Sequence, residues 1–167
     1  MRKIVIGVVG GGEATKRDKR YAYELGALIA KEGWILLNGG RSAGIMEASS
    51  KGCKEHGGIT LGILPDKNST EASRYIDIQI LTGMGDARNV IVALSSDIII
   101  ACKGRAGTIS EIALALKNKR EVILLDFDVD VIFEDYKKER LLFKAASPEE
   151  AIRVVKDILS AKGCKHL

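Results

Sequence analysis

The sequence predicts an α/β protein with a Rossmann-like, doubly wound and mostly parallel sheet that carries helices on both faces. Strand-length apolar segments alternate with helical segments along almost the whole chain. The strand segments are continuously apolar, as in "DIIIAC", and do not alternate between apolar and polar residues. Because strands of this kind are buried on both faces, they are typical of a parallel sheet between two helical layers.

The predicted strands are apolar runs that end in glycine or in a polar residue. They cover residues 4–9, 34–38, 59–65, 97–102 and 121–126. Residues 75–83 are an extended segment with Ile at alternate positions, and a short edge strand covers 140–147. The predicted helices carry apolar residues at helical spacing. They cover residues 20–33, 43–58, 85–96, 107–119 and 147–163. The last helix has the clearest start, with Ser147 as N-cap, Pro148 at the first helical position and Glu150 at the third. The polar stretch 127–139 has no predicted element.

Size, charge and cysteine content narrow the class of protein. The 167 residues contain no repeat and no long linker, so we expect one domain over residues 1–167. The net charge of +4 suits a small anionic ligand but is too small to indicate a nucleic-acid partner. The sequence shows no signal peptide or transmembrane segment, which predicts a cytoplasmic protein without a membrane partner. Cys53, Cys102 and Cys164 lie far apart, so we expect no metal site and no disulfide framework, with Cys102 in the core.

Glycine-rich turns follow three of the predicted strands. They contain Gly10, Gly11 and Gly12, then Gly39, Gly40 and Gly44, and finally Gly104 and Gly107. In a parallel sheet the carboxyl ends of the strands meet at one edge, where ligands bind. Helix N-termini at that edge offer free N–H groups to anions. The sequence therefore predicts an anion-binding crevice, although it contains neither a P-loop nor a clean dinucleotide fingerprint.

Several side chains near these turns allow two interpretations. Thr108 and Glu111 have the spacing of a capping box, with Thr108 as N-cap; alternatively they face a ligand. Arg88 either forms a surface ion pair or contacts the ligand. Arg105 either binds a phosphate or occupies the space that a phosphate would need.

Four motifs together resemble a known family. The segments "NGGRSAGIMEASSKG", "GILP", "TGMGDARN" and "GRAGTISEIALALKNK" have the order and spacing of the Lonely Guy and molybdenum-cofactor-carrier-like proteins, a group long mislabelled as lysine decarboxylases. The resemblance covers residues 3–126. The "GIMEA" and "GMGDARN" forms are more similar to the carrier-like branch.

The resemblance implies site residues as well as a Rossmann-like fold. Lonely Guy enzymes are phosphoribohydrolases that cleave the N-glycosidic bond of an adenosine 5′-monophosphate. Their signature is matched here by Gly104, Gly107, Thr108 and Glu111, and their arginine by Arg88, so that Arg88 and Glu111 would be catalytic and the turn would hold the phosphate. The signature departs at Lys103 and Arg105, which replace a proline and a glycine. A further departure, Asn89 in place of a lysine, weakens the case for hydrolysis.

The carrier-like branch, by resemblance, binds an anionic molybdopterin cofactor without turning it over. The leading hypothesis is therefore a protein that binds a molybdopterin-type cofactor or a nucleoside monophosphate, with Asp86 and Asn89 among the ligand-binding residues. A phosphoribohydrolase and a nucleotide-sensing regulatory module are the alternatives, and lysine decarboxylation is disfavoured. We also expect a homo-oligomer, either a dimer or a tetramer, because the helices at 85–96 and 107–119 carry more apolar residues than one buried face requires.

Overall fold

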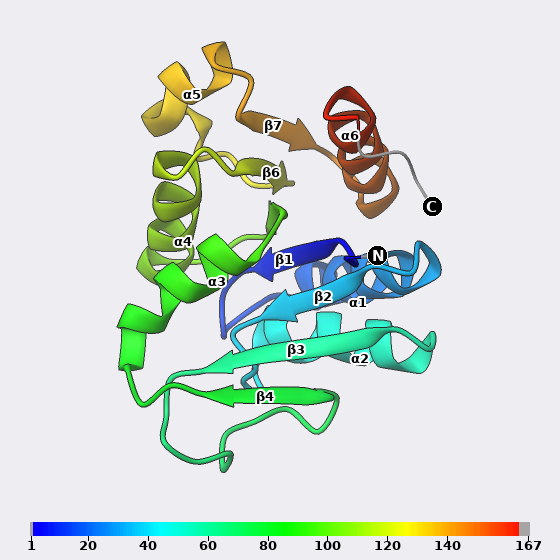
Figure 1. Ribbon diagram of the computed structural model, residues 1–167, viewed down its shortest axis with the longest axis vertical. Coiled ribbons are helices and arrows are strands. Elements are labelled where there is room, and N and C mark those ends of the chain that lie inside the picture. The colour runs from blue at the N-terminus through cyan, green and yellow to red at the C-terminus, as the bar shows by residue number, and fades with distance from the viewer. Residues whose placement is uncertain (1, 164–167) are drawn as a thin grey trace.

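The computed structural model describes residues 2–163 and confirms the predicted fold class. Seven parallel strands form one sheet in the order β4-β3-β2-β1-β5-β6-β7, with helices on both faces (Figure 1). Cys164 lies outside the described residues. Within residues 2–163, no helix is both long and apolar enough to span a membrane.

The predicted strands are all present, and most of the helices begin and end close to their predicted bounds. The strands are β1 (Val5–Val9), β2 (Ile35–Asn38), β3 (Ile59–Leu64), β4 (Ile78–Leu81), β5 (Ile98–Ala101), β6 (Glu121–Leu125) and the edge strand β7 (Leu142–Ala145). The helices are α1 (Lys16–Lys31), α2 (Gly44–Glu55), α3 (Asn89–Ser95), α4 (Ala106–Lys117), α5 (Glu134–Lys138) and α6 (Pro148–Ala161), with 3-10 turns η1 (Gly85–Arg88) and η2 (Asp130–Phe133).

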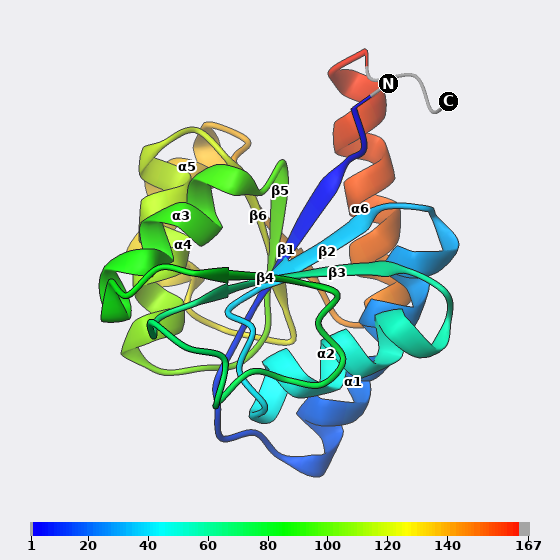
Figure 2. The same cartoon turned by 60° about the horizontal axis from the view of Figure 1, so that its bottom comes forward.

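The two faces of the sheet bury separate apolar clusters. Helices α1, α2 and α6 cover one face, and α3, α4 and α5 lie on the other (Figures 1 and 2). Strand β5 supplies both clusters, since Ile98 and Ile100 point to the first and Ile99 to the second, and all three are fully buried. Burying such a side chain stabilises the fold by about 1.5–3 kcal/mol. This two-sided burial explains why the strands are apolar throughout.

Two local structures differ from the prediction. Helix α1 begins at Lys16, four residues early, because Thr15 caps it: Oγ1 of Thr15 accepts from the Asp18 N–H, and Oδ2 of Asp18 accepts from the Thr15 N–H. The stretch 127–139, predicted to lack an element, contains η2 and α5, with Phe133 buried against the sheet. Because η2 and α5 are short, their residues show too little helical periodicity to be recognised in the sequence.

The strand order reverses between β1 and β5, and the glycine-rich turns meet there. The N–H of Gly11, after β1, donates to the Lys103 carbonyl after β5 at 2.9 Å. The N–H of Ile45, in the first turn of α2, donates to the Gly11 carbonyl at 3.0 Å. All three turns therefore lie at one edge, beyond the carboxyl ends of the strands, as predicted.

Candidate functional site

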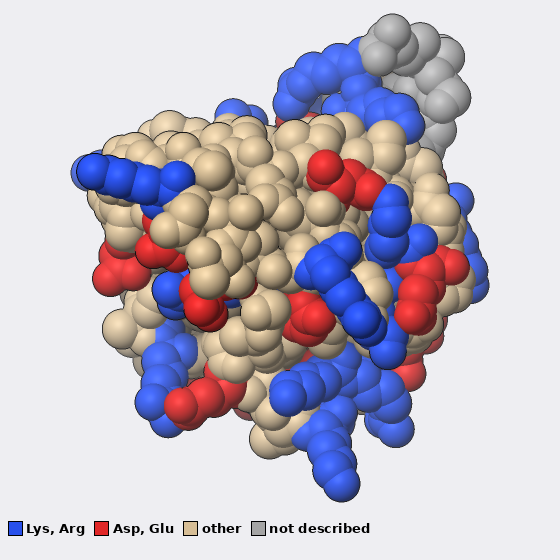
Figure 3. All heavy atoms as spheres, turned by 90° about the horizontal axis from the view of Figure 1, so that it is seen from below, with Lys and Arg blue, Asp and Glu red and all other residues tan. Residues whose placement is uncertain are grey.

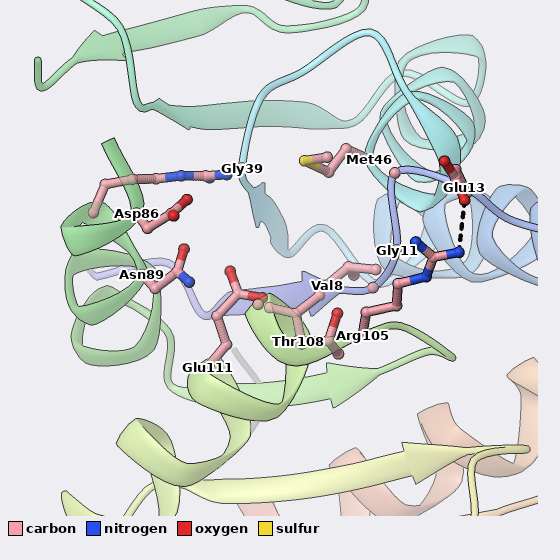
Figure 4. A pocket seen from close by; sticks show the side chains of 15 residues that line it. Val8, Gly11, Glu13, Gly39, Met46, Asp86, Asn89, Arg105, Thr108 and Glu111 are labelled. Carbon is pink, nitrogen blue, oxygen red and sulfur yellow. Dashed lines mark ion pairs between the residues drawn. The ribbon is translucent and has the colours of Figure 1, made fainter. Parts of the chain in front are cut away.

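A cavity of about 350 Å³ opens at this edge, and we call it the inner cavity. Side chains from η1, α2 and α4 converge on it around the end of β1 (Figure 4). It is lined by Val8, Val9, Gly10, Gly11, Gly12, Glu13, Gly39, Met46, Asp86, Arg88, Asn89, Arg105, Gly107, Thr108 and Glu111. Ten of the thirteen predicted site residues are among them, so the inner cavity collects most of the predicted site.

The other three predicted glycines do not line the inner cavity and have packing roles. A Cβ on Gly104 would overlap Oγ1 of Thr108, and one on Gly44 would overlap the Gly11 carbonyl. Gly40 and Gly44 also have φ values of +75° and +49°, which side-chain-bearing residues rarely adopt. Gly44 and Gly104 let their turns approach the turn after β1 closely, whereas Gly40 lets its turn pack against Gly62 and Leu64 of β3.

Helix α4 begins without a side-chain cap at the cavity. Its first residue is Ala106 and its N-cap is Arg105, so Thr108 is the third helical residue and the predicted capping box is wrong. Of the other helices that start at this edge, α1 and α6 are capped by Thr15 and by Ser147. Helix α2 also lacks a side-chain cap, but the N–H of Ile45 in its first turn already donates to the Gly11 carbonyl. In the part of the chain that the structure describes, no side chain accepts from the first N–H groups of α4. They remain available to an anion, which the helix dipole would also attract.

Glu111 lies one turn further along α4, with its side chain directed into the inner cavity (Figure 4). Only 7% of the residue is exposed. Burial raises the pKa of its carboxyl to about 7, and the positive charge of Arg88 opposes that rise. Near neutral pH the carboxyl is therefore poised between its acid and its carboxylate, and the acid form can donate a hydrogen bond.

Arg88 is partly buried at the end of η1, where it has an incomplete set of partners. Its Nη1 donates to the Ile63 carbonyl at 2.8 Å. Its Nε is fully buried, and within residues 2–163 it finds no acceptor. Burial lowers the pKa of the guanidinium, which the charge of Glu111 partly restores. Arg88 forms no ion pair with any described residue, so the surface-ion-pair interpretation is wrong.

Gly39 makes the position of Arg88 possible. A Cβ at residue 39 would overlap Nη1 and would lie 2.6 Å from Nη2 of Arg88. The guanidinium therefore rests against the Cα of Gly39, between the end of β2 and the cavity. Glycine is therefore needed at position 39 to leave room for the Arg88 guanidinium, and not only to form the turn after β2.

Asp86, Asn89 and Thr108 complete the polar lining. Asp86 is exposed at the cavity mouth, whereas Asn89 is 8% exposed and donates through Nδ2 to Oγ of Ser110 at 2.9 Å. Thr108 is 4% exposed beside Gly104. The hydrogen bond from Asn89 holds α3 against α4, which fixes one wall of the cavity.

Arg105 reaches across the mouth of the cavity to Glu13 (Figure 4). Its Nη2 lies 3.0 Å from Oε2 of Glu13, and the two side chains are 88% and 83% exposed. Glu13 and Met46 were not predicted as site residues. Met46 lies within the quoted segment "NGGRSAGIMEASSKG", and Glu13 directly follows Gly10, Gly11 and Gly12, but neither residue type identifies a ligand contact on its own.

Fold and cavity together define a Rossmann-like protein with a polar cavity at the switch point of its sheet. The chain belongs to the SLOG cluster4 family, whose model matches residues 3–152. It is 50% identical to the molybdenum cofactor binding protein of the phototrophic bacterium Rippkaea orientalis, with a TM-score of 0.90 over 95% of this chain and 99% of that one. It is 43% identical to the molybdenum cofactor carrier protein of Chlamydomonas reinhardtii, with a TM-score of 0.88 over the same shares. An uncharacterized protein of Archaeoglobus fulgidus is 49% identical over 125 residues, which are 75% of this chain and 82% of the relative.

These relatives confirm the predicted resemblance to the carrier-like branch. The family match over residues 3–152 includes every residue that lines the inner cavity.

Proposed function

We propose that this protein binds the molybdenum cofactor, a pterin carrying a phosphate, in the inner cavity and releases it unchanged. The relatives named for that cofactor support the ligand class. The observation that carries the proposal is the incomplete set of partners around Arg88. A buried guanidinium N–H without an acceptor costs free energy, which an anionic or carbonyl group of a ligand would recover.

Two ends of the cavity suit two parts of such a ligand. The uncapped start of α4 and the backbone of Gly10 and Gly11 suit the phosphate, because Gly107 has nothing within 4 Å of its Cβ position and leaves the helix end open. Arg88 and Glu111 suit the polar edge of the pterin, since they offer a cation and a carboxyl that can donate or accept. Asp86 and Asn89 are the further predicted contacts.

A binding titration tests this function. The protein should bind molybdenum cofactor released anaerobically from a molybdoenzyme, and Arg88→Met should weaken binding roughly 10- to 100-fold, the range for a hydrogen bond to a charged group. The matched control is Arg153→Met, since Arg153 is exposed on α6 away from the cavity. Equal affinity of the two variants and the unaltered protein would reject the inner cavity as the site.

Glu111 favours a second candidate, hydrolysis of a nucleoside 5′-monophosphate. A buried carboxyl with a pKa of about 7 can orient water or stabilise positive charge on a ribose. Water would add to C1′ while the C1′–N bond breaks and the base leaves with a proton. Release of adenine from adenosine monophosphate, measured by chromatography and abolished by Glu111→Gln, would establish this activity. If the unaltered protein releases no adenine, hydrolysis is excluded and cofactor binding remains the proposed function.

We also propose that the protein is a homo-oligomer that buries the β4 side of the sheet. Ile78, Ile80, Leu81 and Met84 are 42–48% exposed, and Leu94 of α3 is 44% exposed. Much of the surface seen from the β4 edge is uncharged (Figure 3). Most apolar residues of α3 and α4 pack in the apolar cluster beneath these helices, with Leu94 as an exposed exception, so β4 is the better candidate. Light scattering should give a mass above one chain, and Ile80→Glu should reduce it.

The cytoplasmic location stays a prediction.

A further inference from the structure

A second cavity, of about 430 Å³, lies on the far side of the Arg105–Glu13 ion pair. We call it the outer cavity. Beyond Arg105 and Glu13, which line both cavities, its polar lining comes from Thr15, Asp18 and Lys103. One ion pair therefore forms the boundary between two spaces at the same edge of the sheet.

This boundary has a rigid floor and a movable wall. The floor is backbone, where the Gly11 N–H donates to the Lys103 carbonyl at 2.9 Å and a Cβ on Gly104 would lie 2.9 Å from the Gly11 nitrogen. The wall is the Arg105 and Glu13 side chains, which are 88% and 83% exposed. Exposed ion pairs contribute little to stability, so rotation of these side chains joins the two cavities at small cost.

The outer cavity differs from the inner one in its chemistry. Lys103 lies 2.9 Å from Asp126 and 3.9 Å from Asp18, so its charge is already balanced. Oδ2 of Asp18 accepts from Oγ1 of Thr15, and Thr15 caps α1, so this helix end offers no anion site. Carboxylates beside a cavity suit sugar hydroxyls, as in dinucleotide-binding proteins. The outer cavity is thus better suited to a nucleoside than to a second free anion.

Arg105 lies between the inner and outer cavities, and its guanidinium can bind a pyrophosphate. A guanidinium binds phosphate oxygens through two parallel hydrogen bonds. It occupies the N-cap position of α4, next to the uncapped N–H groups of that helix. A phosphate chain that crosses the glycine floor from the inner to the outer cavity would pass directly beside it.

We propose that the inner and outer cavities are two subsites for one extended ligand, a pterin joined through a pyrophosphate to a nucleoside. Arg105 exchanges Glu13 for the pyrophosphate when this ligand binds, and the nucleoside occupies the outer cavity. The proposal rests on the proposed function, because it places the pterin and the first phosphate in the inner cavity.

Two forms of the cofactor test the proposal. They are the phosphomonoester form and the guanine dinucleotide form, each released anaerobically from a purified molybdoenzyme and titrated against the protein. The dinucleotide should bind roughly tenfold more tightly, equivalent to one charge-assisted hydrogen bond. Arg105→Gln should remove this difference, and Glu13→Gln should increase it by releasing Arg105. The controls Arg153→Gln and Glu149→Gln change exposed residues of α6 and should have no effect.

The outcomes separate this proposal from the one on which it rests. If the phosphomonoester binds and depends on Arg88, but the dinucleotide binds no more tightly, the two-subsite proposal is overturned and cofactor binding stands. The same holds if Arg105→Gln leaves the ratio of the two affinities unchanged. If neither form binds, both proposals are overturned.

Discussion

The buried carboxyl of Glu111 makes stability depend on pH in a way that one substitution can reveal. Its pKa in the folded protein is about 7, against 4.5 for an ordinary glutamate. Between these values the folded state holds a proton that the unfolded state has released, so stability falls as pH rises from about 4.5 to about 7 and then levels off. At about 1.4 kcal/mol for each pKa unit, the difference corresponds to about 3 kcal/mol above pH 7.

Glu111→Gln removes this titration and keeps the shape of the side chain. The variant should match the unaltered protein at pH 4.5 and exceed its free energy of unfolding by up to about 3 kcal/mol at pH 8. Urea denaturation at several pH values measures the difference directly, provided that the slope with urea concentration is unchanged. Glu149→Gln, at an exposed position of α6, should show no such dependence. A difference between Glu111→Gln and the unaltered protein that stays constant from pH 4.5 to 8 would refute the burial argument.

Two glycine substitutions separate ligand binding from folding. Gly39→Ala places a methyl group against the Arg88 guanidinium, so it should leave the circular dichroism spectrum intact and weaken cofactor binding roughly tenfold; unchanged affinity would show that Arg88 is not held by this contact. Gly107→Ala adds a Cβ in open space within α4, so it should stabilise the protein by about 0.4–1 kcal/mol, or about 1–4 °C in thermal midpoint. The same methyl group should weaken cofactor binding, since Gly107 lines the inner cavity; tighter or equal binding would move the phosphate away from the start of α4.

The fold could be predicted because the hydrophobicity of the strand residues indicates that the strands are buried. A run such as that of β5 is buried on both faces, and its side chains alternate between the two apolar clusters, so hydrophobicity alone identifies it. Helix starts were harder to predict. The T-x-x-E spacing at Thr108 is typical of a capping box, but the residues before Thr108 are already helical, so α4 begins at Ala106. At Thr15, the acid that completes the capping box is an aspartate inside a charged run, which a pattern based on apolar residues does not detect.

For the candidate site, the position of the inner cavity could be predicted from the sequence, but the contacts within it could not. Glycines at three strand ends were enough to locate the edge where the inner cavity opens. The roles of individual residues depend on tertiary contacts between segments far apart in the chain, such as Arg88 with Ile63 and with Gly39. The partner of Arg105 is equally distant, since Glu13 lies on the loop before α1. No local pattern contains these pairings.

A crystal structure of the protein loaded with molybdenum cofactor would show where the ligand binds, because molybdenum scatters anomalously and marks its own position. We expect the phosphate at the first turn of α4, beside Gly11 and Gly107, with the pterin within hydrogen-bond distance of Arg88. Cofactor density elsewhere on the protein, with the inner cavity holding only water, would contradict it.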